Sequence, residues 1–227
     1  KTKSLSPDRL AFYSYAHVPW IKGNGQRGFK DEDVPRDDAK RRLYEIGKEL
    51  LYENEYYEIG MDHFALKTDS LYKAFKNNTL HRNFMGYSSS KTQLMVGLGV
   101  SSISDSWYGF AQNVKNLEDY YQLLEWDKLP VLRGHILTEE DLKIRKHILN
   151  LMCQFETSWE EESDYFNEIP EIIIQLKEME NDGLLIISKN GIQITEKGKP
   201  FVRNICMAFD LRLKRKAPET ELFSMTV

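Results

Sequence analysis

The chain has 227 residues, of which 41% are hydrophobic and 29% are charged. This composition supplies enough apolar material for one or two hydrophobic cores and excludes a wholly disordered chain. Acidic residues outnumber basic residues by 35 to 31, which gives a net charge of −4. A chain that is acidic overall is poorly suited to non-specific nucleic-acid binding, because such binding requires a basic surface.

The two cysteines, Cys153 and Cys206, each lie in an apolar stretch. We expect both to be buried thiols of a reducing compartment, because two isolated cysteines cannot form a disulfide framework. No stretch approaches the roughly 20 apolar residues of a membrane span. The first residues also lack the apolar centre of a signal peptide. These features predict a cytoplasmic protein without a membrane partner.

Residues 1–129 are predicted to form an α/β layer. The elements expected in it are, in chain order, a strand over 10–16, a helix over 37–52, a strand over 56–61, a helix over 69–77, a strand over 94–103, and a loop followed by a helix over 104–124. The initial order of strand, helix and strand is typical of a parallel βαβ unit.

Residues 130–227 are predicted to form a mostly helical second domain. Thr138 and Asp141 have the spacing of a capping box that begins a helix. Asn190-Gly191 lies between two β-prone runs and predicts a hairpin near 184–195. Helices followed by a hairpin resemble a winged-helix domain.

Two more helices are expected in this second domain. Pro170 in a first turn and Gly183 just past the end are typical of the two ends of one helix. Thr195 is expected to cap a final helix that continues to about residue 215.

Two histidines are expected to line a site. His17 and His63 each follow a predicted strand by one or two residues, and ligands bind at the carboxyl ends of strands in α/β folds. The five histidines of the chain have no zinc-binding spacing. Arg27 and Arg82 lie in irregular segments at the same predicted edge, where arginine can bind a carboxylate through two hydrogen bonds. Solvated surface arginines are the alternative interpretation.

Six segments resemble one family. They are YAHVP (15–19), GMDHFA (60–65), LHRNFMGY (80–87), GLGVSSIS (97–104), FAQN (110–113) and RNICMAFD (203–210). Together they resemble the C-terminal half of oxygen-independent coproporphyrinogen III oxidase, a radical S-adenosylmethionine enzyme of haem biosynthesis. The resemblance covers nearly the whole chain.

The resemblance implies an α/β fold. It implies the C-terminal portion of an incomplete radical S-adenosylmethionine (β/α) barrel in residues 1–129, followed by a mostly helical, winged-helix-like domain in residues 130–227. It also implies an oxidoreductase that uses a deoxyadenosyl radical to convert two propionates of coproporphyrinogen III to vinyl groups, giving protoporphyrinogen IX. A 4Fe–4S cluster, S-adenosylmethionine and an unidentified electron donor would serve the full-length enzyme.

The family binds its cluster through a CxxxCxxC motif, and a chain with only two cysteines cannot contain that motif. We therefore expect this chain to be a piece of the enzyme that is inactive alone, with no catalytic residue, no metal ligand and no tightly bound cofactor. The full-length enzyme is expected to be a monomer. The present chain is expected to self-associate through an unpaired strand edge, either at 10–16 or in an adjacent strand.

The resemblance implies four positions for S-adenosylmethionine. Ala16 and Ile103 match positions that contact this cofactor in the family. Phe84 and Met85 match a Phe-Gln pair, and Met85 replaces the usual glutamine. Ala16 and Ile103 are small or apolar, so they would shape the pocket and would not form side-chain hydrogen bonds.

Four further residues are candidates for the substrate side: Arg27, Asp62, His63 and Arg82. A tetrapyrrole with four propionates needs cationic partners, because a buried and unpaired carboxylate is costly. Two other functions stay open. One is a non-catalytic haem- or tetrapyrrole-binding relative. The other, a winged-helix nucleic-acid binder, is disfavoured by the acidic balance and by the apolar and acidic run at 171–180.

Overall fold

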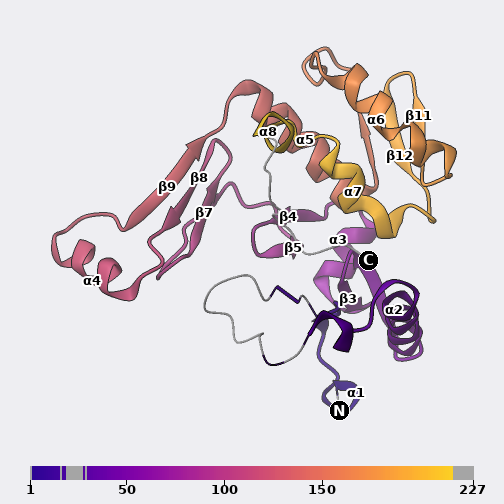
Figure 1. The fold of residues 1–227 in the computed structure, drawn as a ribbon, viewed down its shortest axis with the longest axis horizontal. Coiled ribbons are helices and arrows are strands. Elements are labelled where there is room, and N and C mark those ends of the chain that lie inside the picture. Colours follow the sequence, from indigo (N-terminus) through magenta and orange to yellow (C-terminus); the bar gives the residue numbers. More distant parts are fainter. Residues whose placement is uncertain (1, 16, 19–27, 29, 217–227) are drawn as a thin grey trace. The chain divides into compact units, whose positions relative to one another are not determined.

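The computed structural model describes residues 2–15, 17–18, 28 and 30–216. These described residues form two compact units, one within residues 1–73 and 210–227 and one within residues 74–209. Figure 1 traces the elements of both units in sequence colours. The helices and strands are a mixture of both types throughout, as expected for an α/β protein. Among the described residues, no helix combines the length and the apolar character needed to cross a membrane.

The first unit contains a three-stranded sheet and its helices. Its elements are α1 (Thr2–Leu5), β1 (Arg9–Ala11), η1 (Asp31–Asp33), α2 (Asp37–Tyr52), β2 (Tyr56–Gly60), β3 (His63–Leu66), the start of α3 (Ser70–Lys76) and α8 (Leu211–Lys216). The strand order is β1–β3–β2, and both pairings are antiparallel. Phe64 is fully buried, and Phe12 packs against it edge-on and stacks on Tyr44 of α2. Aromatic side chains thus join α2 to the sheet.

The expected parallel pairing in this unit is wrong. β1 and β2 run in the same direction, because each is antiparallel to β3, but β3 lies between them. A tight turn with Met61 at a positive φ returns the chain directly into β3. The sequence-based interpretation missed β3 because this strand has only four residues and follows β2 closely.

The second unit contains a helical region, residues 139–209. Its elements are α5 (Glu139–Gln154), β10 (Glu156–Ser158), α6 (Ile169–Asn181), β11 (Leu185–Ser188), β12 (Gly191–Ile194), η2 (Lys199–Phe201) and α7 (Val202–Met207). The strands form an antiparallel sheet in the order β10–β12–β11. The fully buried side chains of this region include Leu151, Ile172, Leu176, Leu185, Ile205 and Phe209.

The local signals of this region are mostly confirmed. The Thr138–Asp141 capping box is present at α5, and Pro170 lies in the first turn of α6. The hairpin is also present, although its two-residue loop is Lys189-Asn190, one residue earlier than expected. Both cysteines are buried and free, as predicted.

The expectation of one continuous final helix is wrong. The structure has the short helices η2 and α7, and then α8, in place of one helix to residue 215. Thr195 donates hydrogen bonds to the carbonyls of Gly183 and Leu184, so it fixes the end of the hairpin. Asp210 accepts a hydrogen bond from the Leu213 amide and so begins α8 as a separate helix.

The rest of the second unit is a β-rich region. A small hairpin pairs β4 (His81–Asn83) with β5 (Gly86–Ser88). It is followed by a four-stranded antiparallel sheet of β6 (Leu94–Met95), β7 (Ile103–Ser106), β8 (Gly109–Asn113) and β9 (Val131–Ile136), with α4 (Leu117–Glu125) between β8 and β9. We name residues 94–136 the arm. Figure 1 shows α4 at the end of the arm that lies farther from α5.

The arm corrects two expectations. The strand predicted over 94–103 is two strands, β6 and β7, separated by the loop that contains Gly97 and Gly99. The loop predicted after residue 104 contains most of β7 and all of β8. Strands of two to five residues present too few alternating positions to be recognised from hydrophobic pattern alone.

Candidate functional site

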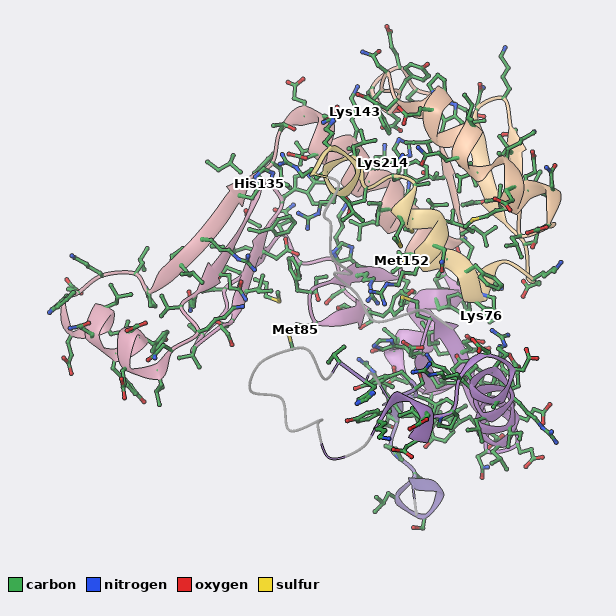
Figure 2. The ribbon with its side chains drawn as sticks, viewed as in Figure 1. Lys76, Met85, His135, Lys143, Met152 and Lys214 are labelled. Carbon is green, nitrogen blue, oxygen red and sulfur yellow. The ribbon has the colours of Figure 1, made fainter. Side chains whose placement is uncertain are left out.

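The turn of the β4–β5 hairpin carries two of the predicted site residues. Asn83 pairs with Gly86, so Phe84 and Met85 are the two residues of the turn. The Asn83 Oδ1 atom accepts a 2.9 Å hydrogen bond from the Met85 amide, and Gly86 takes the positive φ that closes the turn. Met85 is 82% exposed, and Figure 2 shows it at this turn. The local chemistry of the turn therefore presents Phe84 and Met85 outward.

Phe84 is joined to the arm by an aromatic contact. Its ring packs edge-on against Phe110 of β8, with the ring centres 5.1 Å apart. Phe110 pairs with Asp105 of β7, so Ile103 is its diagonal neighbour on the same face of the sheet. Two of the residues predicted to contact S-adenosylmethionine, Phe84 and Ile103, are thus brought to one face of the arm.

The same face is anchored to α5 by an ion pair that is largely buried. The Arg145 Nη2 atom lies 2.8 Å from Asp105 Oδ1, and Arg145 Nη1 donates to the Ser106 carbonyl at 2.9 Å. The guanidinium also stacks 5.1 Å from the Trp107 ring centre and 5.0 Å from that of Phe110. An ion pair with this many additional contacts holds its partners in one geometry. Arg145 therefore fixes the end of the β7–β8 hairpin on α5.

A second link between the arm and α5 uses the capping box. The Asp141 Oδ2 atom accepts hydrogen bonds from the amide and hydroxyl of Thr138, both at 2.9 Å. It also lies 3.0 Å from His135 Nε2 on β9. Figure 2 labels His135 on β9 and Lys143 on α5. The carboxylate that begins α5 thus also orients the last strand of the arm.

Arg82 is half-buried, which differs from the solvated surface arginine of the alternative interpretation. Its guanidinium carbon lies 4.7 Å from the ring centre of Tyr87, and its Nη1 atom is buried without a hydrogen-bond partner in the described part of the chain. Burial raises the pKa of Cys153 and that of Cys206 to about 12, and the positive charge of Arg82 opposes both shifts. The charge of Arg82 therefore acts on both buried cysteines.

A buried histidine lies on the same strand as Arg82. Burial, followed by the charges of Lys91 and Arg145, lowers the pKa of His81. The neutral form of His81 is therefore favoured at this position.

The described part of the first unit contains three other candidates, Asp62, His63 and His17. Asp62 and His63 are adjacent at the turn between β2 and β3, where the Asp62 carbonyl accepts a 2.7 Å hydrogen bond from the Phe12 amide. Both side chains are half-buried. His17 is also half-buried, and its ring stacks on that of Tyr15. Ala16 and Arg27 lie outside the described residues.

The residues that assemble this face were not predicted as site residues. Phe110 belongs to the FAQN segment, which was a signal for it, but Asp105 and Arg145 belong to no motif. Their contact joins positions 40 residues apart. No local spacing in the sequence indicates such a pair.

The cluster implied by the resemblance can be tested against the residues present. Cluster ligation requires thiolates, whereas burial keeps Cys153 and Cys206 in their neutral thiol forms. Among the described residues, no three histidine, cysteine or carboxylate side chains gather as a potential metal site. These residues do not fit a 4Fe–4S cluster. The apolar pair Phe84 and Ile103, by contrast, is compatible with one wall of a cofactor pocket.

Comparison with known proteins identifies the relatives of the chain. No protein-family model matches it. The chain is 38% identical over 225 residues to "Oxygen-independent coproporphyrinogen III oxidase" of Escherichia coli K12, covering 96% of this chain and 48% of that protein. It is 36% identical over 236 residues to the protein of the same name from Synechocystis, covering 100% of this chain and 50% of that protein. The chain thus spans about half the length of the curated relatives it matches.

A solved structure gives the same result. Coproporphyrinogen III oxidase from Escherichia coli, described as a radical SAM enzyme, aligns with a TM-score of 0.86 and 37% identity over 93% of this chain and 50% of that chain. The chain is therefore similar to a radical SAM enzyme. The resemblance to oxygen-independent coproporphyrinogen III oxidase is confirmed, and the chain is homologous to about half of that enzyme. This share fits the expected C-terminal half.

Proposed function

We propose that this chain contributes one wall of the reaction chamber of an oxygen-independent coproporphyrinogen III oxidase. The observation that carries the proposal is the contact between Phe84 and Phe110, which brings Phe84 to the face that also carries Ile103. Motif resemblance assigns Phe84 and Ile103 to S-adenosylmethionine independently of this contact. The identity of 38% over nearly the whole chain supports the relation to this oxidase.

The proposed reaction is the oxidative decarboxylation of two propionates of coproporphyrinogen III to vinyl groups. In the complete enzyme, a 4Fe–4S cluster and S-adenosylmethionine supply the radical that begins the reaction. The proposed role of this chain is to orient the cofactor through apolar contacts and to exclude water from the cofactor. Ile103 and Phe84 do this through packing, and Met85 and Ala16 belong to the same proposed wall. The chain alone is proposed to be inactive.

The substrate side is proposed to involve Arg82, Asp62, His63 and Arg27. Arg82 is the candidate with the clearest physical support, because its buried Nη1 donor has no partner in the described part of the chain. A propionate that reached this donor would gain a charge-assisted hydrogen bond. Asp62 and His63 are also proposed for the substrate side, as adjacent residues at one turn of the first unit.

The organisation of the chain is proposed to follow the family. Residues 1–129 would form the last part of an incomplete barrel, and residues 130–227 a winged-helix-like domain. The strand order β10–β12–β11, with α5 before it and α6 preceding the β11–β12 hairpin, supports the second part. Among the described strands, β1 lies at an edge of its sheet, which supports self-association of this chain through that edge. We further propose a cytoplasmic, monomeric complete enzyme that uses a separate electron donor and binds no nucleic acid.

The test is a chimera in which this chain replaces the matching region of the Escherichia coli oxidase. We expect the chimera, with cluster and reductant, to convert coproporphyrinogen III and to form deoxyadenosine under anaerobic conditions. Ile103→Asp should lower S-adenosylmethionine affinity by about tenfold or more, because it buries a charge beside the cofactor. The matched control is Ile186→Asp, at an exposed isoleucine of β11. A chimera with equal affinity in both variants would contradict the proposed wall.

The alternative is a relative that binds a tetrapyrrole without reaction. The Nη1 donor of Arg82, which has no hydrogen-bond partner among the described residues, supports this alternative equally, because the donor requires only an anionic ligand. The two are separated by the same chimera. Substrate binding without deoxyadenosine formation, in a chimera whose cluster is intact, would support the binding protein and contradict the oxidase.

A further inference from the structure

The arm has an unusually large exposed apolar surface. Its large hydrophobic side chains that are exposed to solvent are Leu94, Val96, Leu98, Tyr108, Leu117, Tyr121, Leu124, Trp126, Leu129, Val131, Leu132 and Ile136. From the arm, only Val114 contributes to the buried hydrophobic core of the described chain. A sheet ordinarily buries one apolar face. Exposed apolar surface on this scale marks an interaction site.

The apolar side chains of α4 form a stripe. Leu117, Tyr121 and Leu124 follow one another at i, i+4 and i+7, the spacing that places residues on one face of a helix. All three are about half exposed, and α4 contains no buried residue. We name these three residues the α4 stripe.

The α4 stripe is held in place from a neighbouring side of the helix. The hydroxyl of Tyr120 accepts a 3.2 Å hydrogen bond from the amide of Gly99, in the loop between β6 and β7. Tyr120 and Leu123 are the half-buried residues of α4, so they form the side that meets the arm. The other segments of the arm therefore cover only part of the apolar surface of α4, and the α4 stripe is the part that they leave exposed.

The α4 stripe is close in the fold to the residue matched to S-adenosylmethionine. Ile103 begins β7 directly after the loop that Tyr120 contacts, whereas the opposite end of β7 is the end that Arg145 anchors to α5. Leu98 in that loop and Leu129 after α4 are 85% and 84% exposed. Exposed apolar side chains therefore surround the Ile103 end of the arm.

We propose that the α4 stripe, with Leu98 and Leu129, is the docking surface for the polypeptide corresponding to the half of the relatives that this chain does not span. This inference rests on the proposed function. The occupant follows from length, because the relatives are about twice as long as the region they share with this chain. It also follows from chemistry. Helix α4 carries three carboxylates, Glu118, Asp119 and Glu125, and no basic residue. The partner surface is therefore apolar at its centre and basic at its rim.

The experiment compares hydrogen exchange of α4 in this chain alone and in the chimera described above. We expect the amides of α4 to exchange about tenfold more slowly, or slower still, in the chimera, because docking suppresses local opening of the helix. Tyr121→Glu in the chimera should return α4 to the rate of the isolated chain. Ile174→Glu, at an isoleucine of α6 that is also exposed, is the matched control and should leave that rate unchanged.

Two results would overturn the inference. One is an α4 that exchanges at the same rate in both proteins, even in a chimera that is active. The other is a concentration-dependent dimer of this chain that protects α4 and that Tyr121→Glu abolishes, since the occupant would then be a second copy. A chimera that protects α4 but forms no product would leave the docking surface standing and would contradict the proposed function.

Discussion

The helical region and the arm belong to the same compact unit but are stabilised in different ways. The helical region, residues 139–209, has a core of fully buried side chains such as Leu151, Ile172 and Phe209. The arm is held to α5 mainly by polar contacts, those of Asp105 with Arg145 and of His135 with Asp141. The comparison indicates that the helical region folds on apolar burial, whereas the arm requires a second surface to reach comparable stability.

The largest expected effect comes from paired leucine truncations in two helices. Leu151→Ala in α5 removes a side chain with no exposed area and should lower the free energy of unfolding by about 2–5 kcal/mol. Leu124→Ala in α4 removes a side chain that is 46% exposed and should change it by about 0.5 kcal/mol or less. Urea denaturation of both variants measures the difference. Similar losses in the two variants would mean that the arm has a core of its own.

Sequence reasoning succeeded where the signal was local. The bounds of α2 were predicted as observed, because its apolar spacing and acidic first turn lie within 16 residues. The capping box of α5 and the ends of α6 depend on side chains next to the backbone groups they satisfy. These contacts require no knowledge of the rest of the fold.

It failed where the structure depends on contacts between distant segments. The insertion of β3 between β1 and β2 and the pairing of the short arm strands are set by tertiary packing, which overrides weak local preference. For the site, motif resemblance named Phe84 and Ile103, but the sequence contained no sign of the Arg145–Asp105 pair that orients the face they share. Arg82 stays a prediction as a substrate-side residue, and its charge effect on the two buried cysteines follows only from the fold.

A titratable group in the core of the helical region should make the stability of this region depend on pH. His147 is fully buried, and its Nε2 atom donates to the Asp164 carbonyl at 2.9 Å while Nδ1 lies 2.8 Å from the Thr157 hydroxyl. Burial lowers its pKa from 6.5. The hydrogen bond to the Asp164 backbone and the charge of Asp164 oppose this shift, whereas the charges of Lys146 and Lys143 add to it. The folded state therefore binds its proton more weakly than the unfolded state.

The sign of the effect follows from that difference. The stabilising contribution of neutral His147 is present above pH 6.5 and is lost as the pH falls through 6.5 toward the lower pKa of the folded state. We expect the unfolding free energy, measured by urea denaturation between neutral and mildly acidic pH, to decline over this range. His147→Gln should be less stable throughout but should show a shallower decline. An unchanged slope in this variant would assign the pH dependence to other groups, such as His81, whose pKa burial also lowers.

The smallest expected effects come from removing one helix-capping side chain in each region. They distinguish local opening of a helix from global unfolding. Thr138 accepts a hydrogen bond from the Asp141 amide at the start of α5, and Asn116 accepts one from the Glu118 amide at the start of α4. Each substitution to alanine should cost its own helix about 1 kcal/mol. Because α5 packs into the core, Thr138→Ala should lower the global unfolding free energy. Because α4 contains no buried residue, we expect it to open independently of the core, so Asn116→Ala should instead accelerate hydrogen exchange in α4 alone. If Asn116→Ala lowered the global value as much as Thr138→Ala, the arm and the helical region would unfold as one unit, and the exposed apolar surface of α4 would not require a partner for its stability.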